Sequence, residues 1–393
     1  MFGELMRKLM KPLRWLAGSL ALTGAGIVML NTKIVANVDA TTLTDASQYQ
    51  HGKFHNVHAF EQPGLLKTLE IAKRYFTEPA VDKVPAKTIP LQPLSRQQLD
   101  ALPDNDVHFV KLGHSSVLLK VYGEYWLLDP VFSQRASPFS FLGPKRFHQT
   151  PISIAELPAI AKVLISHNHY DHLDKASIKQ LAAKTTQFLV PLGVETDLQK
   201  WGVAAEKIQR FDWWQEQVSD NALIAFTPTQ HFSGRGIGDG NTTLWGSWVI
   251  KTLAGAVYFS GDSGYFDGFK QIGSKYGPFD ISFIETGAYD NDWAHIHMTP
   301  EQSVQAHLDV KGQVMVPVHN GTFDLAFHAW YEPLERVSIA ASQADTALLT
   351  PEFGQLVSLS QLHSSVAQNS YWWQALIPQA ELAATGATEA AAQ

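Results

Sequence analysis

The sequence predicts an α/β fold made of two packed mixed sheets flanked by helices. From residue 107 onward, short runs rich in β-branched and aromatic residues alternate with polar turns, which is the pattern of successive strands. Helix-start signals at Asp174 and Thr299 lie between these runs. Two hairpin-like segments open the series. Strands and helices that alternate in this way pack as layers around one core.

Composition narrows the class of protein further. The chain has 393 residues, of which 45% are hydrophobic and 17% charged, so it can bury one large core or two modest ones. A net charge of −7 argues against a nucleic-acid partner, which needs a basic face. The absence of cysteine excludes disulfides, zinc–thiolate sites and cysteine nucleophiles. Any metal ion must therefore be held by histidine and carboxylate side chains.

The first 35 residues are expected to be a signal or membrane-anchor segment. Four basic residues before Trp15 precede an uncharged stretch over residues 15–30. As a helix, these sixteen residues span about 24 Å, against about 30 Å for a bilayer core. A cleaved signal and a buried helix stay open as alternatives, but the poor cleavage site at residues 38–40 favours an anchor. The positive-inside rule then predicts an inner-membrane-anchored or periplasmic protein whose remaining domain lies outside the cytoplasm.

Residues 36–104 are expected to form an N-terminal extension that packs on the core. Residues 64–76 are amphipathic, with Leu65, Leu69, Ala72 and Phe76 at helical spacing. Core packing is the favoured role of this helix, and a membrane-facing position near a site is the alternative. A proline-rich strap follows over residues 79–93, and residues 95–98 form a capping box for a short helix.

The first predicted strands, over residues 107–112, 117–121 and 125–128, end near two polar residues of interest. His114 lies in the turn after the first strand and either supports that turn or takes part in chemistry. Asp129 directly follows the third strand. We expect its carboxylate to orient a metal-bound histidine.

The most informative stretch is a short apolar run over residues 163–166 that ends in a cluster of polar side chains. His167 and His169 are two residues apart, so on an extended chain they point the same way and can share one metal ion. Asp171 and His172 follow where the chain turns, which suits a second ion close by. Asp174 then caps a helix predicted over residues 175–184. A lone histidine would indicate little, but burying this whole cluster without a cation would cost about 1–3 kcal/mol for each unpaired group.

Later strands repeat the same arrangement. Runs over residues 223–227, 256–259 and 314–318 are followed by His231, Asp262 and His319. Further strands are predicted over residues 187–190, 246–250 and 280–284, a helix from Thr299, and a tryptophan-rich patch at Trp201, Trp213 and Trp214.

The His-x-His-x-Asp-His motif at residues 167–172, with the order of these strand ends, resembles the metallo-β-lactamase superfamily over about residues 105–335. The resemblance implies the αββα sandwich of that superfamily. It also implies two Zn²⁺ ions, with Asp262 and a hydroxide between them. One ion would be held by His167, His169 and His231, and the other by Asp171, His172 and His319.

A narrower resemblance rests on Gly113-His114-Ser115, on residues 260–265, 297–301 and 319–323, and on the eight residues from His167. These are similar to the N-acylphosphatidylethanolamine-hydrolysing phospholipase D family, and the likeness reaches back to about residue 50. It implies a phosphodiesterase of phospholipase D type that releases an N-acylethanolamine and phosphatidic acid, with Asp171, Asp262 and His297 as catalytic residues. Asn320 departs from the tryptophan expected there, which bears on pocket shape.

Other assignments accompany this interpretation. His295 and Arg235 are further candidates for phosphate binding. The expected partner is a phospholipid substrate at a membrane surface, and the sequence indicates no protein partner. The catalytic domain is expected over residues 105–375, followed by a disordered tail over residues 376–393.

Two other functions stay open. The first is a lactone or small phosphoester hydrolase of the ascorbate-phosphate lactonase type, using the same two ions. The second is a membrane-tethered binding protein on an inactivated fold, which the intact set of seven ligands disfavours.

Overall fold

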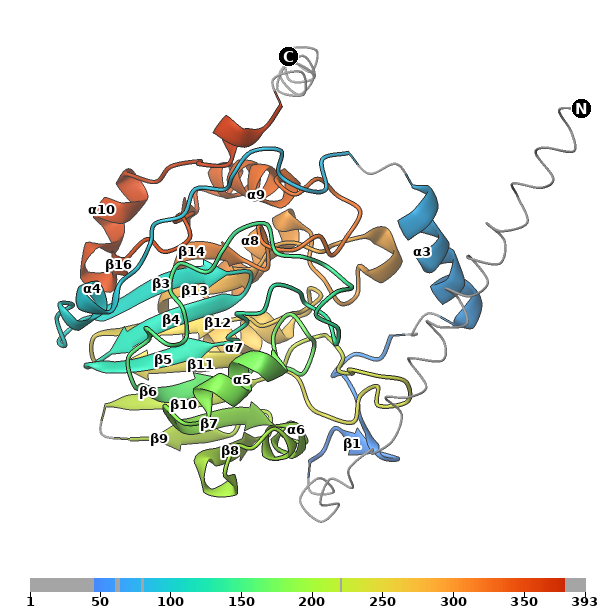
Figure 1. The fold of residues 1–393 in the computed structure, drawn as a ribbon, viewed down its shortest axis with the longest axis horizontal. Coiled ribbons are helices and arrows are strands. Elements are labelled where there is room, and N and C mark those ends of the chain that lie inside the picture. Colours follow the sequence, from blue (N-terminus) through green and yellow to red (C-terminus); the bar gives the residue numbers. More distant parts are fainter. Residues whose placement is uncertain (1–45, 61–63, 79–80, 220, 379–393) are drawn as a thin grey trace, which may run out of the picture.

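Two seven-stranded sheets stack face to face in the computed structural model (Figure 1), which describes residues 46–60, 64–78, 81–219 and 221–378. The predicted membrane anchor, the small-residue site after it and most of the predicted disordered tail lie outside these residues. Within them, no helix is long and apolar enough to cross a membrane.

The first sheet carries the strands that precede and follow the histidine motif. Its spatial order is β16, β3, β4, β5, β6, β7, β8. Strands β16 to β5 are antiparallel to their neighbours, and β5 to β8 run parallel. The bounds are β3 Val107–Gly113, β4 Ser116–Val121, β5 Glu124–Leu128, β6 Ile160–Leu164, β7 Thr185–Pro191, β8 Ile208–Phe211 and β16 Val357–Ser358.

The second sheet has the order β15, β14, β13, β12, β11, β10, β9. Strands β12 to β15 run parallel to one another, so β12, β13 and β14 end at one edge of the sheet, and β9 to β12 are joined by antiparallel pairs. The bounds are β9 Glu216–Val218, β10 Ala222–Thr227, β11 Ser247–Thr252, β12 Gly255–Phe259, β13 Phe279–Glu285, β14 Gly312–Val318 and β15 Ala347–Leu348.

The main core lies between the sheets and follows from the two-residue period of a strand. In β5, Trp126 and Leu128 point into the space between the sheets, while Tyr125 and Leu127 belong to a second cluster on the outer face. In β14, Val314 and Val316 likewise face inward. Both faces of each sheet are therefore covered, as the predicted layered fold requires.

Helices cover the two outer faces. On the first sheet, α5 (Lys175–Leu181) and α6 (Glu195–Lys200) bury Ile178, Leu181 and Leu198. On the second sheet lie α7 (Gly268–Tyr276), α8 (Pro300–Asp309) and α9 (Glu332–Gln343). The shorter helical segments are η1 Ala205–Lys207, η2 Asn291–Trp293, η3 Leu359–Gln361, α10 Leu362–Ala367 and η4 Gln374–Leu376. The structure thus confirms the predicted αββα sandwich.

The helix starts follow the predicted capping signals. The Asp174 side chain accepts a hydrogen bond from the Ala176 N–H, which begins α5. Thr299 and Gln302 form a capping box at α8, with Pro300 in the first turn. Ser95 forms the predicted capping box at α4 (Arg96–Asp100).

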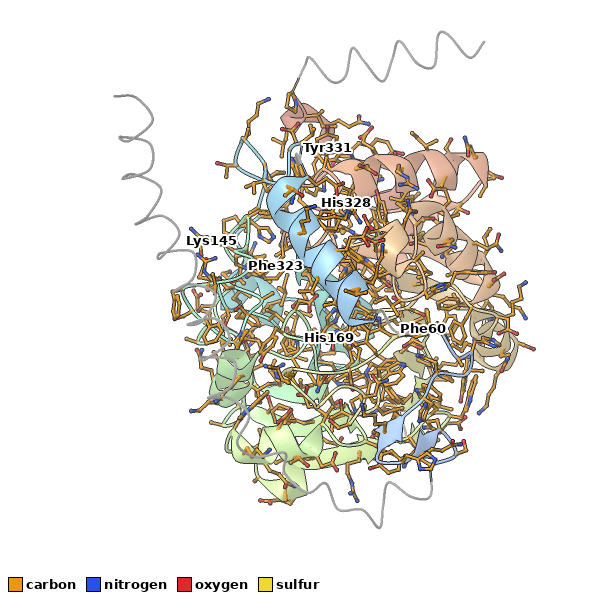
Figure 2. The ribbon with its side chains drawn as sticks, turned by 90° about the vertical axis from the view of Figure 1, so that its right-hand side faces the viewer. Phe60, Lys145, His169, Phe323, His328 and Tyr331 are labelled. Atoms are coloured by element: carbon orange, nitrogen blue, oxygen red, sulfur yellow. The ribbon has the colours of Figure 1, made fainter. Side chains whose placement is uncertain are left out.

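The N-terminal extension contributes a small two-stranded sheet, β1 (Tyr49–Gln50) with β2 (Lys53–Phe54), and helix α3 (Leu65–Thr77). Phe54 is fully buried in the core between the sheets, and its N–H donates to Asn241 O over 2.8 Å. Helix α3 lies across one face of the molecule (Figure 2), and on it Leu66 and Leu69 are 83% and 57% exposed. The favoured interpretation of Leu69 as a core residue is therefore wrong.

The predicted tryptophan patch is also wrong. Trp201, Trp213 and Trp214 pack against three different hydrophobic clusters. The Trp213 Nε1–H donates to Trp245 O over 2.6 Å, and Trp214 stacks with Tyr276. These side chains support the fold and do not form one apolar surface.

Candidate metal centre

The seven predicted ligands meet where strand ends of the two sheets converge. Residues 167–172 follow β6 of the first sheet, and the other three ligands come from the second sheet. There, His231 follows β10, Asp262 follows β12 and His319 follows β14. The structure brings these side chains into two neighbouring groups, each within 4.8 Å across its ligand atoms.

The first group consists of His167, His169, His231 and Asp262. The His169 Nδ1 atom lies 2.9 Å from His167 Nε2 and 3.2 Å from His231 Nε2. Asp262 Oδ2 is 3.7 Å from His167 Nε2 and 3.8 Å from His231 Nε2. Three ring nitrogens and one carboxylate oxygen thus lie close together, and four such donors are the number that a zinc ion commonly takes.

The second group consists of Asp171, His172, His319 and His114. The Asp171 Oδ2 atom is 2.9 Å from His114 Nε2, 3.1 Å from His319 Nε2 and 3.5 Å from His172 Nε2. Asp262 reaches this group too, since its Oδ1 lies 3.1 Å from His172 Nε2 and its Oδ2 lies 3.1 Å from His319 Nε2. Asp262 therefore stands between the two groups, as a shared carboxylate would.

His114 is closer to this centre than the sequence indicated. It lies in the tight turn between β3 and β4, and its ring packs 4.1 Å from the His319 ring, centroid to centroid. The sequence suggested either support of that turn or chemistry, and the structure adds its Nε2 to the second group of possible ligands.

A buried carboxylate behind the second group orients it. Asp129 Oδ2 lies 2.7 Å from His172 Nδ1, so the other ring nitrogen of His172 faces Asp171 and Asp262. The Ser166 N–H and hydroxyl both donate to Asp129, over 2.7 and 2.5 Å. Asp129 therefore contacts a candidate ligand histidine as expected, and such partners fix the tautomer of metal-binding histidines.

The backbone around the centre is strained at the same residues. His114, Asp129 and His319 have φ values of 50°, 40° and 64°, which residues with a side chain rarely adopt. Gly261 precedes Asp262 at φ 57°, where an added Cβ would lie 2.7 Å from Gly246 O. Strain of this kind costs roughly 1–3 kcal/mol per residue and clusters at functional sites.

The electrostatics of the first group suit metal binding. Burial lowers the pKa of His169 to about 4 and holds the pKa values of His167 and His231 well below their usual range. These three rings are therefore neutral near pH 7, and neutral imidazole is the form that binds a metal ion.

In the second group, two buried carboxylates favour positive charge on the groups beside them. Burial opposes the charged form of His319, yet the Asp262 and Asp171 carboxylates raise its pKa to about 10. They raise the pKa of His172 in the same way. Burial would also raise the pKa values of Asp171 and Asp262, but the neighbouring histidines hold both well below their usual range. Two buried carboxylates that stay ionised require cations beside them.

The unpartnered polar atoms test whether metal ions fit here. Among the described residues, His172 Nε2 and Asp262 Oδ1 are buried, lie 3.1 Å apart and make no hydrogen bond. Leaving such groups unpaired costs about 1–3 kcal/mol each. Nitrogen and oxygen donors without sulfur match Zn²⁺ and related divalent ions. The residues present therefore fit a metal centre.

A cavity of about 560 Å³ lies directly above the candidate ligands. His169, Asp171, Asp262 and His319 line its polar side. The rest of the wall is largely apolar and comes from loops and from α3, with Phe60, Thr68, Ile71, Phe232, Ala288, Trp293, Ile296 and Leu325 among its residues. Figure 2 shows α3 crossing the face on which His169 and Phe60 lie.

His297 also lines this cavity, and a buried carboxylate holds it in place. Its Nδ1 pairs with Glu285 Oε1, a residue that is fully buried at the end of β13. The other Glu285 oxygen accepts a hydrogen bond from the Ser263 N–H over 2.6 Å. Burial raises the pKa of Glu285 and lowers that of His297 to about 4. The sequence pointed to His297 but missed Glu285, although this residue too follows an apolar strand.

The remaining residues singled out in the sequence differ in whether they line this cavity. His295 lines the cavity. Arg235, the other candidate for phosphate binding, does not line this cavity. Its Nη1 donates to Asn168 O and Leu173 O over 2.6 and 2.7 Å, which secures the loop that carries the ligands. Asn320, where a tryptophan was expected, is buried and accepts a hydrogen bond from Lys111 Nζ over 2.9 Å.

Comparison with known proteins agrees with this geometry. The family described as the beta-lactamase superfamily domain matches residues 125–320. An uncharacterised protein of Mycobacterium tuberculosis is 45% identical over 249 residues, 62% of this chain and 67% of that one. The N-acyl-phosphatidylethanolamine-hydrolyzing phospholipase D 1 of Caenorhabditis elegans is 30% identical over 337 residues, 79% of this chain and 94% of that one.

Solved structures show the same fold. Igni18, a metallo hydrolase from Ignicoccus hospitalis, superposes with a TM-score of 0.50 at 22% identity, covering 64% of this chain and 97% of that one. At this identity the likeness concerns the fold alone.

Proposed function

Because the chain belongs to the metallo-β-lactamase superfamily, within the N-acylphosphatidylethanolamine-hydrolysing phospholipase D-like family, we propose that it is a zinc-dependent phosphodiesterase acting on N-acylated phosphatidylethanolamine. The products would be an N-acylethanolamine and phosphatidic acid. The superfamily makes the protein a metal-dependent hydrolase, and the substrate is the proposed part.

The observation that carries the proposal is the cavity above the candidate ligands. Its base combines histidines and carboxylates, and its wall is largely apolar, with Phe60, Phe232 and Trp293 among its residues. A phospholipid likewise combines a charged group, the phosphodiester, with apolar acyl chains. The volume of about 560 Å³ lies within the range of about 300–1,000 Å³ typical of ligand sites.

The proposed cofactor is two Zn²⁺ ions per chain. His167, His169 and His231 would hold one ion, Asp171, His172 and His319 the other, and Asp262 both. When bound, such ions act as Lewis acids that activate water near neutral pH and neutralise charge on a phosphoryl group.

The residues of the chain hold the site in position. Asp262 contacts histidines of both groups and so fixes their separation, while Asp171 holds His172 and His319 of the second group together. His297, held through Nδ1 by Glu285, lines the cavity, and because its pKa is lowered to about 4 it would contact a bound phosphodiester as a neutral ring near pH 7. Asp129 contacts Nδ1 of His172, which leaves Nε2 of that ring directed at the centre.

Product analysis tests the substrate. Purified protein would be incubated with vesicles of N-acylated or plain phosphatidylethanolamine, and the lipids would be separated by mass spectrometry. We expect release of phosphatidic acid and N-acylethanolamine from the N-acylated lipid, and none from an Asp262→Ala variant. Hydrolysis of a lactone or a small phosphoester, with both lipids intact, would contradict the proposed substrate and leave a hydrolase of another specificity.

We also propose that the catalytic domain works outside the cytoplasm, attached to the inner membrane or released to the periplasm. The support is the basic cluster before Trp15 and the uncharged residues 15–30. A reporter enzyme fused after Gln393 should be active only after export. Activity confined to the cytoplasm would reverse this assignment.

A further inference from the structure

A second opening lies beside the metal cavity. It is a groove of about 710 Å³, which is the size of a site for a small organic molecule. Its wall combines aromatic rings with polar side chains: His58, Ala59, Phe60, Gln230, Tyr265, Phe266, Ala294, His295 and Gln302. None of these residues is a candidate metal ligand, although Gln230 precedes His231 in the chain.

Phe60 and His295 join the groove to the metal cavity. Both side chains line both openings, and their rings stack with centroids 6.1 Å apart. A ligand that reaches from the metal cavity into the groove must pass this pair. The pair is therefore the threshold between the two openings.

Two glutamine side chains give the groove a defined hydrogen-bonding character. The Gln230 Nε2–H donates to His58 O over 2.7 Å, which fixes the orientation of its amide. Its Oε1 is buried and accepts no hydrogen bond among the described residues. The Gln302 Oε1 accepts a hydrogen bond from the Thr299 N–H over 3.0 Å, and no contact to its Nε2 occurs in the described part of the chain. The Gln230 Oε1 acceptor and the Gln302 Nε2 donor thus have no hydrogen-bond partner among the described residues.

We propose that this groove is a subsite for the amide-bearing acyl arm of the substrate. A secondary amide carries one N–H donor and one carbonyl acceptor, which complement Gln230 Oε1 and Gln302 Nε2. Phe60, Tyr265 and Phe266 supply apolar surface for the attached chain. The inference rests on the proposed function, because the N-acyl group of that substrate is such an arm and the phosphodiester would lie across the threshold, at the metal centre.

A binding experiment separates this proposal from the catalytic one. Isothermal titration calorimetry would compare N-octanoylethanolamine with 2-hydroxyethyl octanoate, an ester of the same length that lacks the N–H. Wild type should bind the amide about tenfold more tightly, since one hydrogen bond contributes about 0.5–1.5 kcal/mol. Equal affinity for amide and ester would overturn the proposal.

Variants locate the site. Gln230→Met removes the acceptor and should abolish the preference for the amide. Gln302→Glu keeps the capping box at α8 but removes the donor, and should weaken amide binding about tenfold. If both variants bind the amide as wild type does, the groove is not its site.

A variant that fills the groove tests whether the acyl arm of the lipid substrate binds there. Ala294 is exposed and lines the groove, so Ala294→Trp adds a bulky ring without disturbing the core. This variant should lose at least tenfold in kcat/KM on N-acylated relative to plain phosphatidylethanolamine. The matched control is Ala344→Trp, at the exposed end of α9, which should change neither rate.

The two failures are distinguishable. If wild type binds the amide through Gln230 and Gln302 but cleaves neither lipid, the proposed function is wrong and the amide subsite stands. If it cleaves N-acylated lipid while Ala294→Trp retains wild-type discrimination, the function stands and the subsite is wrong.

Discussion

At the scale of single residues, Asp262 determines whether the centre is one site or two. It is the carboxylate that approaches both groups of histidines. Asp262→Ala should lower the metal content well below that of wild type and reduce turnover at least a hundredfold. Elemental analysis of the purified variant checks this. Asp100→Ala on α4 is the control, and an unchanged metal content in Asp262→Ala would refute the bridging role.

A second prediction at this scale concerns Lys111. Burial lowers the pKa of its ammonium group to about 7, from 10.5 for the exposed side chain. Between about pH 7 and 10.5 the unfolded chain therefore binds more protons at Lys111 than the folded chain does, and this group's contribution to the free energy of unfolding rises with pH.

The pH dependence can be isolated by subtraction. Lys111→Met removes the titrating group, so wild type should gain thermal stability relative to this variant as pH rises from 7 to 10. Calorimetric melting curves of both proteins across this range provide the measurement. A constant difference in melting temperature would show that Lys111 does not titrate there.

Individual residues also show which parts of the site can be predicted from the sequence and which cannot. The seven candidate ligands could be picked out because histidines and carboxylates that follow apolar strands have few structural reasons to be there, and the structure brings their side chains together. The position of Arg235 could not be predicted, because a guanidinium suits phosphate and backbone carbonyls equally and only the fold shows which it contacts. Glu285 was missed because its partner His297 lies on a loop whose path the sequence does not specify.

At the scale of elements, α3 is the part of the described chain best placed to meet a lipid surface. Leu66 and Leu69 are exposed, while Thr68 and Ile71 line the metal cavity. Arg74 pairs with Glu78 at the end of the same helix over 2.6 Å, and toward the protein it pairs with Asp290 over 2.8 Å and stacks over Phe327. The helix is thus held by charge and presents leucines outward.

Replacing Leu66 and Leu69 with serine should weaken vesicle binding by tenfold or more and spare hydrolysis of a soluble phosphodiester. The reason is that a fully buried leucine side chain contributes about 1.5–3 kcal/mol. Vesicle sedimentation measures the first effect. Leu308→Ser on α8 is the matched control, and undiminished sedimentation of the α3 variant would exclude a membrane role for this helix.

How well each helix or strand was predicted depended on signals within the element itself. Strands with alternating apolar residues and helices with capping boxes were predicted closely, because the signals lie within the element. The edge strands β15 and β16 were missed because two residues carry no readable period. The three tryptophans were grouped by sequence proximity, yet Trp201 at the end of α6 and Trp213 and Trp214 in the turn between β8 and β9 pack into separate clusters.

At the scale of the whole molecule, the metal centre joins the two sheets. His167, His169, Asp171 and His172 belong to the first sheet, and His231, Asp262 and His319 to the second. Ligands that bind only the folded state add about 2.7 kcal/mol at a concentration a hundred times the dissociation constant. Removing metal with a chelator should therefore lower the melting temperature by several degrees.

Adding Zn²⁺ back should restore the melting temperature, and differential scanning calorimetry of the three samples checks both steps. A chelated sample with an unchanged melting temperature would mean that the centre is not part of the folding equilibrium. The two-sheet arrangement was predictable because the strand-end pattern constrains both sheets at once, whereas the position of α3 depends on contacts that no local pattern encodes.

The spread of the ligands along the chain sets the order in which the centre can be built during synthesis. The first-sheet ligands are complete at residue 172, while His319 emerges only after four fifths of the chain. Chains grow and fold from the N-terminus at about 5–20 residues per second. A nascent chain therefore carries four of its seven candidate ligands well before the other three exist. If the chain is exported, metallation is completed in the compartment that it enters, and the metal supply there decides which ion is loaded.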